Sequence, residues 1–297
     1  MSLKTLDINI PVEEEELQQS QFKLMVRRFC RNKMAVVALV FLVVLVLSAI
    51  FCEQLTPYDY AKQDLLAMNQ LPSKEHIFGT DNFGRDIFTR ILRGARVSLV
   101  VSVMAVAMST VVAVILGALS GYYGGAVDNY IMRLMDILGS IPGMLLSMTV
   151  SAALGTGLVK TAIALAVASI AQLARQLRSS IMLMKNSEYI EAARAFGASD
   201  MEIVLKHIIP NCLAPLIVQI SLSLGSTIMA ISGLSFLGLG VQPPTPEWGN
   251  MVAAGQDFIR NYPHIIIFPG LAVAVTMLAF NLLGDGLRDA LDPKMKR

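Results

Sequence analysis

The side chains that usually carry out catalysis or metal binding are few in this sequence, and they lie far apart. The three histidines, His76, His207 and His264, occupy three separate polar segments, and none has a second ligand three or four residues away. The zinc pattern HExxH, the nucleophile pattern GxSxG and the phosphate-binding pattern GxxxxGK followed by Ser or Thr are all missing, and no cysteine pair has the CxxC spacing. The sequence therefore predicts no catalytic residue, no metal site, no cofactor and no ATP site of that kind.

Polar side chains inside the apolar stretches are also rare. The most polar are three amides and one hydroxyl, at Gln172, Gln219, Ser223 and Asn281. Side chains of this kind more often form hydrogen bonds between helices than bind a substrate. We therefore expect them to join helices.

One polar segment, SEYIEAARAFG at 187–197, has a spacing with a mechanical use. Asn186 or Ser187 can cap a helix whose first turn carries an acidic residue, and Gly197 can end it in a left-handed conformation. The helix predicted between them has about ten residues and a length of about 15 Å. Ser199 begins a capping-box pattern, which predicts a second helix that ends before Pro210.

Two short helices joined by a glycine form a compact elbow. Tyr189, Ala193 and Phe196 share one side of the first helix, and Ala192 and Ala193 are small enough for another backbone to come close. The elbow is either a rigid knob that docks into a partner's groove and passes motion to the rest of the chain, or a plain loop that covers the end of a bundle.

The composition predicts the class of protein to which this elbow belongs. Hydrophobic residues make up 55% of the 297 residues and charged residues only 15%, whereas soluble domains carry about 25% charged residues. The mean hydropathy is +0.60. These values exclude a disordered chain and predict an all-α integral membrane protein, and a net charge of +2 gives no reason to expect nucleic acid as a partner.

Windows without Asp, Glu, Lys or Arg predict six transmembrane helices, within 34–52, 97–127, 137–159, 161–174, 208–246 and 265–284. The fourth window is short and reaches span length only if Lys160 and Arg175 extend to the two interfaces. The charged segment 85–96 keeps its apolar residues on one face, so we expect a helix that lies in the outer interface. The predicted parts are a cytoplasmic tail 1–33, a first helix 34–52, an extracytoplasmic loop 53–96, a five-helix core 97–286 with a coupling loop 176–211, and a cytoplasmic tail 287–297.

The distribution of Lys and Arg predicts the orientation of these helices. With the N-terminus inside, the inner segments hold 16 of the 24 basic residues and the outer segments hold 8. This excess agrees with the positive-inside rule and predicts that both termini are cytoplasmic.

Several motifs together carry a resemblance to a known family. The run Glu191-Ala192-Ala193, followed by Gly197, resembles the EAA loop of binding-protein-dependent ABC importer permeases. The motifs at 78–86, 211–218, 242–249 and 284–293 are similar to those of the dipeptide/oligopeptide/nickel branch, in its DppC/OppC-type subunit. The resemblance extends from about Phe29 to Pro293.

This resemblance implies a type I ABC importer permease fold in the inner membrane of a bacterial cell, surrounded by lipid. It implies a second permease of the DppB/OppB type, two cytoplasmic ATPases and an extracytoplasmic solute-binding protein. Glu191, Ala192, Ala193 and Gly197 would contact an ATPase, with Tyr189 and Phe196 packing beside them. The implied cargo is a small peptide, with a nickel or metal chelate or glutathione as alternatives, and a channel or secondary transporter that works without ATP ranks below these.

The only tryptophan, Trp248, stands in a proline-rich outer segment. It is either part of an outer gate or a contact for the binding protein, or else an anchor at the membrane interface.

Overall fold

The computed structural model describes residues 21–291, and these residues form helices and loops without a β-strand. The outer parts of both predicted tails, 1–20 and 292–297, lie outside the described residues. The α-helices are α1 (Gln21–Arg31), α2 (Lys33–Ile50), α3 (Cys52–Leu55), α4 (Ile87–Tyr123), α5 (Gly125–Gly139), α6 (Gly143–Leu154), α7 (Leu158–Lys185), α8 (Glu188–Ala195), α9 (Asp200–Glu202), α10 (Ile209–Phe236), α11 (Trp248–Gly255) and α12 (His264–Leu291).

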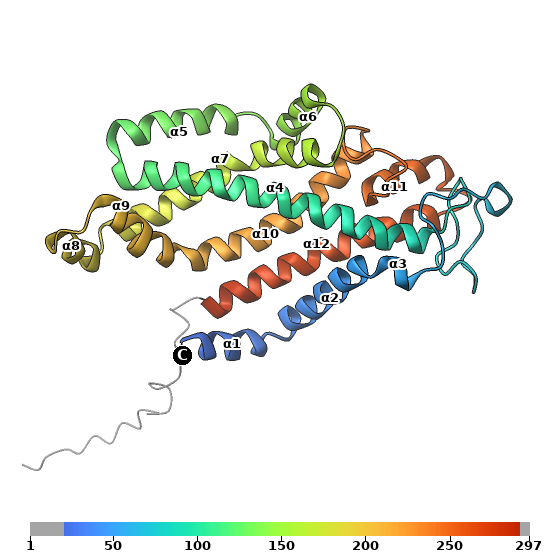
Figure 1. The fold of residues 1–297 in the computed structure, drawn as a ribbon, viewed down its shortest axis with the longest axis horizontal. Helices are drawn as coiled ribbons and strands as arrows, with labels where there is room; N and C mark the ends of the chain where they lie inside the picture. Colours follow the sequence, from blue (N-terminus) through green and yellow to red (C-terminus); the bar gives the residue numbers. More distant parts are fainter. Residues whose placement is uncertain (1–20, 292–297) are drawn as a thin grey trace, which may run out of the picture.

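Five of these helices are long and apolar enough to cross a membrane, and a sixth crossing follows if α5 and α6 count as one span. The five are α2, α4, α7, α12 and the continuous helical stretch Asp200–Phe236 that contains α9 and α10. The number agrees with the six predicted helices. Figure 1 shows them as a bundle of roughly aligned rods, with the elbow at one end and the loop before α4 together with α11 at the other.

The third predicted span differs from the prediction, because it is broken. Helices α5 and α6 meet at an angle of 86° across Ser140, Ile141 and Pro142. Pro142 disfavours the helical conformation of the residue before it and offers no N–H of its own, so the helix stops there and restarts in a new direction.

The prediction of a separate interfacial helix at 85–96 is also wrong. Its residues form the first turns of α4, a single helix of 37 residues whose N-terminus is capped by Asp86. Arg85, Asp86 and Arg90 are buried under the preceding loop and Arg93 pairs with Glu53, whereas Arg96 is exposed. The five-helix core thus begins at Ile87, ten residues before the predicted position.

The fourth span is longer than its charge-free window. Helix α7 continues to Lys185, so Arg175 lies ten residues before its end. The second helix of the elbow, which was predicted to end before Pro210, does not end there either. A π-helical turn at Ile203–Ile208, in which the N–H of Ile209 bonds to the carbonyl of Val204, leads directly into α10. The segment between α7 and α9 is therefore 186–199, shorter than the loop predicted at 176–211.

The closest helix pair is α4 with α7, and two glycines explain how near they come. A Cβ atom added at Gly117 would lie 3.0 Å from the carbonyl oxygen of Ala174, and one added at Gly121 would lie 3.0 Å from that of Arg178. The spacing of four residues puts both glycines on one face of α4. Small residues at this spacing let helices pack backbone against backbone inside a membrane.

Two clusters of buried side chains hold the ends of the bundle. One joins α2, α4, α10, α11 and α12 around the fully buried Trp248. The other joins α4, α7, α8 and α10 around Ile181, Ile190 and Ile208, all three completely buried. The second cluster is the base on which the elbow stands.

Candidate functional site

The elbow has the local geometry that its sequence predicts, with one difference. Helix α8 ends at Ala195, and Gly197 follows with a φ of +84°, a conformation that favours glycine. The Ser199 hydroxyl accepts a hydrogen bond from the N–H of Glu202 at 3.3 Å, as a capping box requires. Ser187 is the N-cap residue of α8, but its hydroxyl donates to the carbonyl of Met184 at 2.6 Å and caps no N–H.

A single apolar side chain anchors α8 to the bundle. Ile190 is completely buried and lies in the cluster formed by the C-terminal parts of α4 and α7 and the start of α10. Ala193, one turn further along, packs against the edge of the same cluster. Ala193 therefore faces the chain's own core, which corrects the expectation that it shares an open side with Tyr189 and Phe196.

Polar contacts tie the elbow to the end of α4. The Tyr122 hydroxyl donates to Asp200 at 2.5 Å, and the Lys185 ammonium donates to the Tyr122 carbonyl oxygen, also at 2.5 Å. A hydrogen bond with the Tyr122 hydroxyl raises the pKa of the Arg194 guanidinium on α8. The two ends of the elbow are thus both held by one residue of α4.

The exposed face of the elbow makes one side-chain contact within the described residues, from the Tyr189 hydroxyl to the sulfur of Met184 at 3.6 Å. Phe196 is 93% exposed and Tyr189 is 42% exposed, and Glu191 and Ala192 are exposed between them. A Cβ atom added at Gly197 would meet nothing within 4 Å, so this glycine is needed for its backbone conformation and not for space. An exposed aromatic on a firmly anchored short helix is a surface suited to docking.

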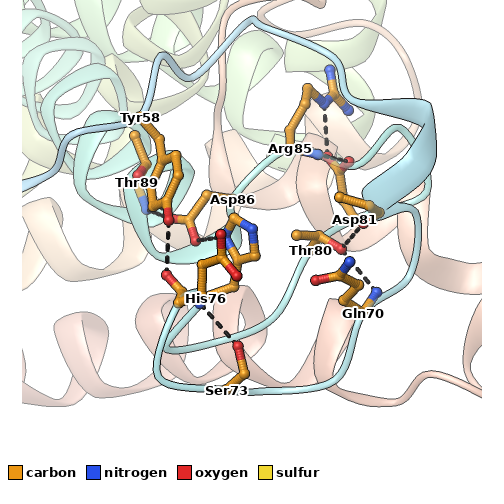
Figure 2. Close-up of polar contacts among 11 residues, drawn as sticks. Tyr58, Gln70, Ser73, His76, Thr80, Asp81, Arg85, Asp86 and Thr89 are labelled. Carbon is orange, nitrogen blue, oxygen red and sulfur yellow. Dashed lines mark hydrogen bonds and ion pairs between the residues drawn. The ribbon is translucent and has the colours of Figure 1, made fainter.

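The other end of the bundle carries a polar network that the sequence analysis did not predict. The Asp81 carboxylate accepts hydrogen bonds from the N–H of Arg85 and from its guanidinium at 2.7 Å (Figure 2). It also accepts from the N–H of Phe83, and Arg90 lies 3.5 Å from it. Arg90 also donates to the carbonyl oxygen of Tyr60 at 2.8 Å. Asp81, Arg85 and Arg90 are all buried, so the loop before α4 neutralises charges that the sequence left without partners.

A second group in this loop caps α4 (Figure 2). The Asp86 carboxylate accepts from the N–H and the hydroxyl of Thr89, both at 2.7 Å, and lies 2.9 Å from Nδ1 of His76. The Tyr58 hydroxyl donates to the carbonyl of Glu75 at 3.1 Å, and partial burial, with the nearby carboxylates of Glu75 and Asp86, raises its pKa. The spacing of Asp81, Arg85 and Asp86 in the motif at 78–86 was the only signal for this network in the sequence.

Trp248 lies beneath this loop and does not reach the surface. Its side chain is completely buried, and its indole N–H donates to the carbonyl oxygen of Ile91 at 3.0 Å. The adjacent Glu247 is also completely buried and accepts from the hydroxyls of Ser98 and Ser232. In this conformation Trp248 offers no surface to a binding protein or to the membrane interface, and it joins α11 to α4.

A bundle of apolar helices with an exposed, well-anchored elbow and no nucleotide-binding pattern of its own defines a class, that of the membrane permeases driven by a separate ATPase. Residues 113–297 match the family model described as "binding-protein-dependent transport system inner membrane component", and residues 20–72 match the N-terminal TM domain of oligopeptide transport permease C. The chain belongs to the family of binding-protein-dependent transport system inner membrane components. It is the non-catalytic permease subunit of an ABC importer, of the DppC/OppC type.

Curated relatives and solved structures agree with this assignment. The chain is 42% identical over 294 residues to the glutathione transport system permease protein GsiD of Pectobacterium atrosepticum, covering 99% of this chain and 98% of that protein. It is 46% identical over 271 residues to GsiD of Escherichia coli O157:H7, covering 91% of this chain and 89% of that protein. An inward-facing structure of the MetNI methionine ABC transporter has a chain with the same fold, with a TM-score of 0.57 at 19% identity over 68% of this chain and 96% of that one.

Membership of this family places the chain in the inner membrane as a multi-pass protein. It also implies, in general terms, a partner permease, ATPase subunits and a binding protein.

Proposed function

We propose that this permease forms half of the translocation pathway for a short peptide, and that glutathione is the first cargo to test. Two relatives with more than 40% identity along nearly their whole lengths are named as glutathione transport permeases. Glutathione is itself a tripeptide, so this cargo is a member of the peptide class that the sequence motifs imply. Nothing in the described residues favours nickel, since no three His, Cys, Asp or Glu side chains gather there as a metal ion needs.

Transport by the reconstituted importer tests the cargo. The permease, its partner permease, its ATPases and its binding protein are placed in proteoliposomes, and ATP-dependent uptake of labelled glutathione is measured. Competition with unlabelled dialanine and with a nickel chelate separates the three cargo classes. Absence of ATP-dependent glutathione uptake, or uptake that dialanine or the nickel chelate suppresses at lower concentration than unlabelled glutathione does, would overturn the glutathione proposal.

We also propose that the elbow at 186–199 is the contact with a cytoplasmic ATPase. The observation that carries this proposal is the exposure of Phe196 at the tip of an elbow whose base is fully buried. A chain without a nucleotide site can respond to ATP only through a contact whose strength differs between the inward-open and outward-open states. The motif residues Glu191, Ala192 and Gly197 lie on or beside the exposed part of α8, and Ala193 supports it from below.

The orientation follows from this contact. Figure 1 shows the start of α1 and the end of α12 at the same end of the bundle as α8. If α8 meets an ATPase, both termini are therefore cytoplasmic and the loop before α4 faces the binding protein and the DppB/OppB-like partner. Accessibility of a single cysteine at Phe196 tests this, because an impermeant thiol reagent added outside intact cells should not reach it.

Co-purification tests the coupling contact itself. Glu191→Arg reverses the charge on the exposed face of α8 and should release the ATPases, whereas Lys206→Ala, whose exposed side chain pairs with Glu202 in the next helix, should not. Unchanged association of the ATPases with the Glu191→Arg permease would refute the assignment.

A further inference from the structure

The side of α7 that is exposed on the surface of the chain is polar along the middle of the helix, unlike the exposed sides of α4 and α12. The exposed residues in the central part of α7 are Gln172, Arg175, Gln176 and Ser179. By contrast, α4 exposes only Val, Ala, Met, Ile and Leu between residues 97 and 119, and α12 exposes only Ile, Leu, Ala and Val between 265 and 284. The faces of α4 and α12 suit lipid, and the face of α7 does not.

The amides on this face make no hydrogen bond within the chain. Gln172, Gln176 and Gln219 have no side-chain partner in the part of the chain that the structure describes, which contradicts the expectation that such residues join helices. Gln172 lies 14 residues after the start of α7 and 13 before its end, so it is about 20 Å from either end. An amide without a partner at that depth costs about 4–8 kcal/mol in hydrocarbon, so these side chains must meet water, cargo or another protein.

The amides of two helices converge on one hollow. Gln176 and Ser180 of α7 and Gln219 of α10 line it together with Pro215 and apolar side chains. Donors and acceptors thus face the same space from both sides. Side-chain amides match the N–H and C=O groups of a peptide because each carries both kinds of group.

Arg175 adds a positive charge to the exposed side of α7, next to the break between α5 and α6. Its guanidinium donates to the carbonyl oxygen of Met135 at 3.3 Å, lies 3.6 Å from the Asp136 carboxylate and covers Gly139, where an added Cβ would be 2.8 Å away. The side chain remains 43% exposed, so it keeps donors for a carboxylate. Residues 139–145 across the break are all exposed, and non-helical backbone at membrane depth is tolerated where it lines a water-filled space or is covered by protein.

From these observations we infer that Gln172, Arg175 and Gln176 of α7, with Gln219 of α10, form this subunit's wall of the translocation pathway and bind the peptide and carboxylate groups of the cargo. The inference rests on the proposed function in its choice of a peptide cargo. Its first test, access of water to the wall, does not depend on which peptide is carried.

Cysteine labelling of the complete importer tests the wall, in a Cys30→Ser background because Cys52 and Cys212 are buried. Gln172→Cys and Gln176→Cys are compared with Val111→Cys and Ile115→Cys, which are exposed on α4 at nearly the same distances from its inner end. A hydrophilic thiol reagent reacts with the thiolate, which forms only in water. During ATP-driven turnover we expect the two α7 cysteines to react at least about tenfold faster than the two α4 cysteines. Equal rates would overturn the inference, because they would show that α7 faces lipid or a sealed interface with the partner permease.

The cargo supplies the second test. Binding protein loaded with a transported peptide should slow labelling of Gln176→Cys, and labelling that cargo never slows would refute the recognition of peptide groups. Arg175→Gln should reduce uptake of an anionic peptide at least about tenfold and Arg175→Lys should restore part of it, with the ATPases still co-purifying. Fast labelling of α7 in an importer that takes up no glutathione would refute only the glutathione cargo and would leave the wall of the pathway in place.

Discussion

Truncation of Phe196 to alanine should weaken binding of the ATPase without weakening the fold. The side chain is 93% exposed, so nearly all of its surface is available to a partner. An aromatic side chain buries about 150–250 Å² when covered completely, and covering half of it is worth about 2.5 kcal/mol. This corresponds to an ATPase affinity about 70-fold lower for Phe196→Ala. Because the residue contacts little in its own chain, the free energy of unfolding should change by less than about 0.5 kcal/mol.

The matched variant is Ile190→Ala, six residues earlier in the elbow. Ile190 is completely buried, so its truncation should cost about 2–5 kcal/mol of stability through the lost apolar contact and the cavity left behind. Affinity is measured by titrating purified ATPase onto the permease pair in nanodiscs, and stability by thermal unfolding of the same sample. The reasoning is refuted if Phe196→Ala binds as tightly as the native permease, or if it lowers the unfolding temperature as much as Ile190→Ala does.

Three further substitutions test the elbow, the helix packing and the outer end. Gly197→Ala should make the loop at 186–199 more sensitive to protease, since a φ of +84° costs an L-residue about 1–2 kcal/mol. Gly121→Val should lower the thermal unfolding temperature, by about 1–3 kcal/mol of stability, because its side chain meets the backbone of α7, and Gly143→Ala, with open space around it, is the control. Trp248→Phe should cost about 1–3 kcal/mol in the same assay through loss of the buried hydrogen bond to Ile91.

Each of these has an outcome that contradicts it. Native protease resistance of Gly197→Ala would show that the elbow does not depend on the left-handed turn. An unfolding temperature for Gly121→Val equal to that of the Gly143→Ala control would mean that α4 and α7 need no close contact there. A native unfolding temperature for Trp248→Phe would show that its indole N–H contributes nothing to the outer end.

The sequence predicted the spans well where charges mark their ends. The final window, 265–284, lies within α12, and the first, 34–52, nearly coincides with α2. The start of α4 was missed because a search for charge-free windows places every charged residue outside the transmembrane helix. Arg90 is accommodated within α4 because the carboxylate of Asp81, nine residues earlier, lies 3.5 Å from its guanidinium. No local sequence pattern indicates such a contact.

The break between α5 and α6 shows why proline alone does not predict a kink in a membrane span. Pro142 stands at the break, but Pro215 and Pro269 lie inside α10 and α12, which continue through them. Neighbouring helices and local adjustment of the turn can satisfy the backbone group that a proline leaves free. Whether they do so depends on the packing of neighbouring helices, which cannot be predicted from the local sequence. The contact of Gly117 and Gly121 with α7 was not predicted from the sequence, although their spacing of four residues places both on one face of α4.

The elbow could be predicted almost completely because its signals are local. A cap, a left-handed glycine and a capping box each involve only a few neighbouring residues, and two of these three have the predicted geometry. The side of α8 that faces the core was not predictable, because Ile190 and Ala193 are drawn inward by side chains of α4, α7 and α10. The polar face of α7 was hidden for a similar reason, since only the complete bundle shows which amides remain without a partner.

One helix connects the two ends at which partners are expected to bind. At its inner end α4 holds the elbow through Tyr122, and at its outer end it carries the Asp86 cap and Arg90, which hold the loop before it. Its 37 residues contain no proline and span about 55 Å, whereas α10 and α12 each contain one. A helix with an unbroken ladder of hydrogen bonds resists bending at any single point. A displacement of the elbow by an ATPase should therefore move α4 as a rigid rod and shift the outer loop with it. If the elbow binds an ATPase and the loop before α4 faces the binding protein, as we propose, this connection links the conformational state of the ATPase to the surface that meets the binding protein.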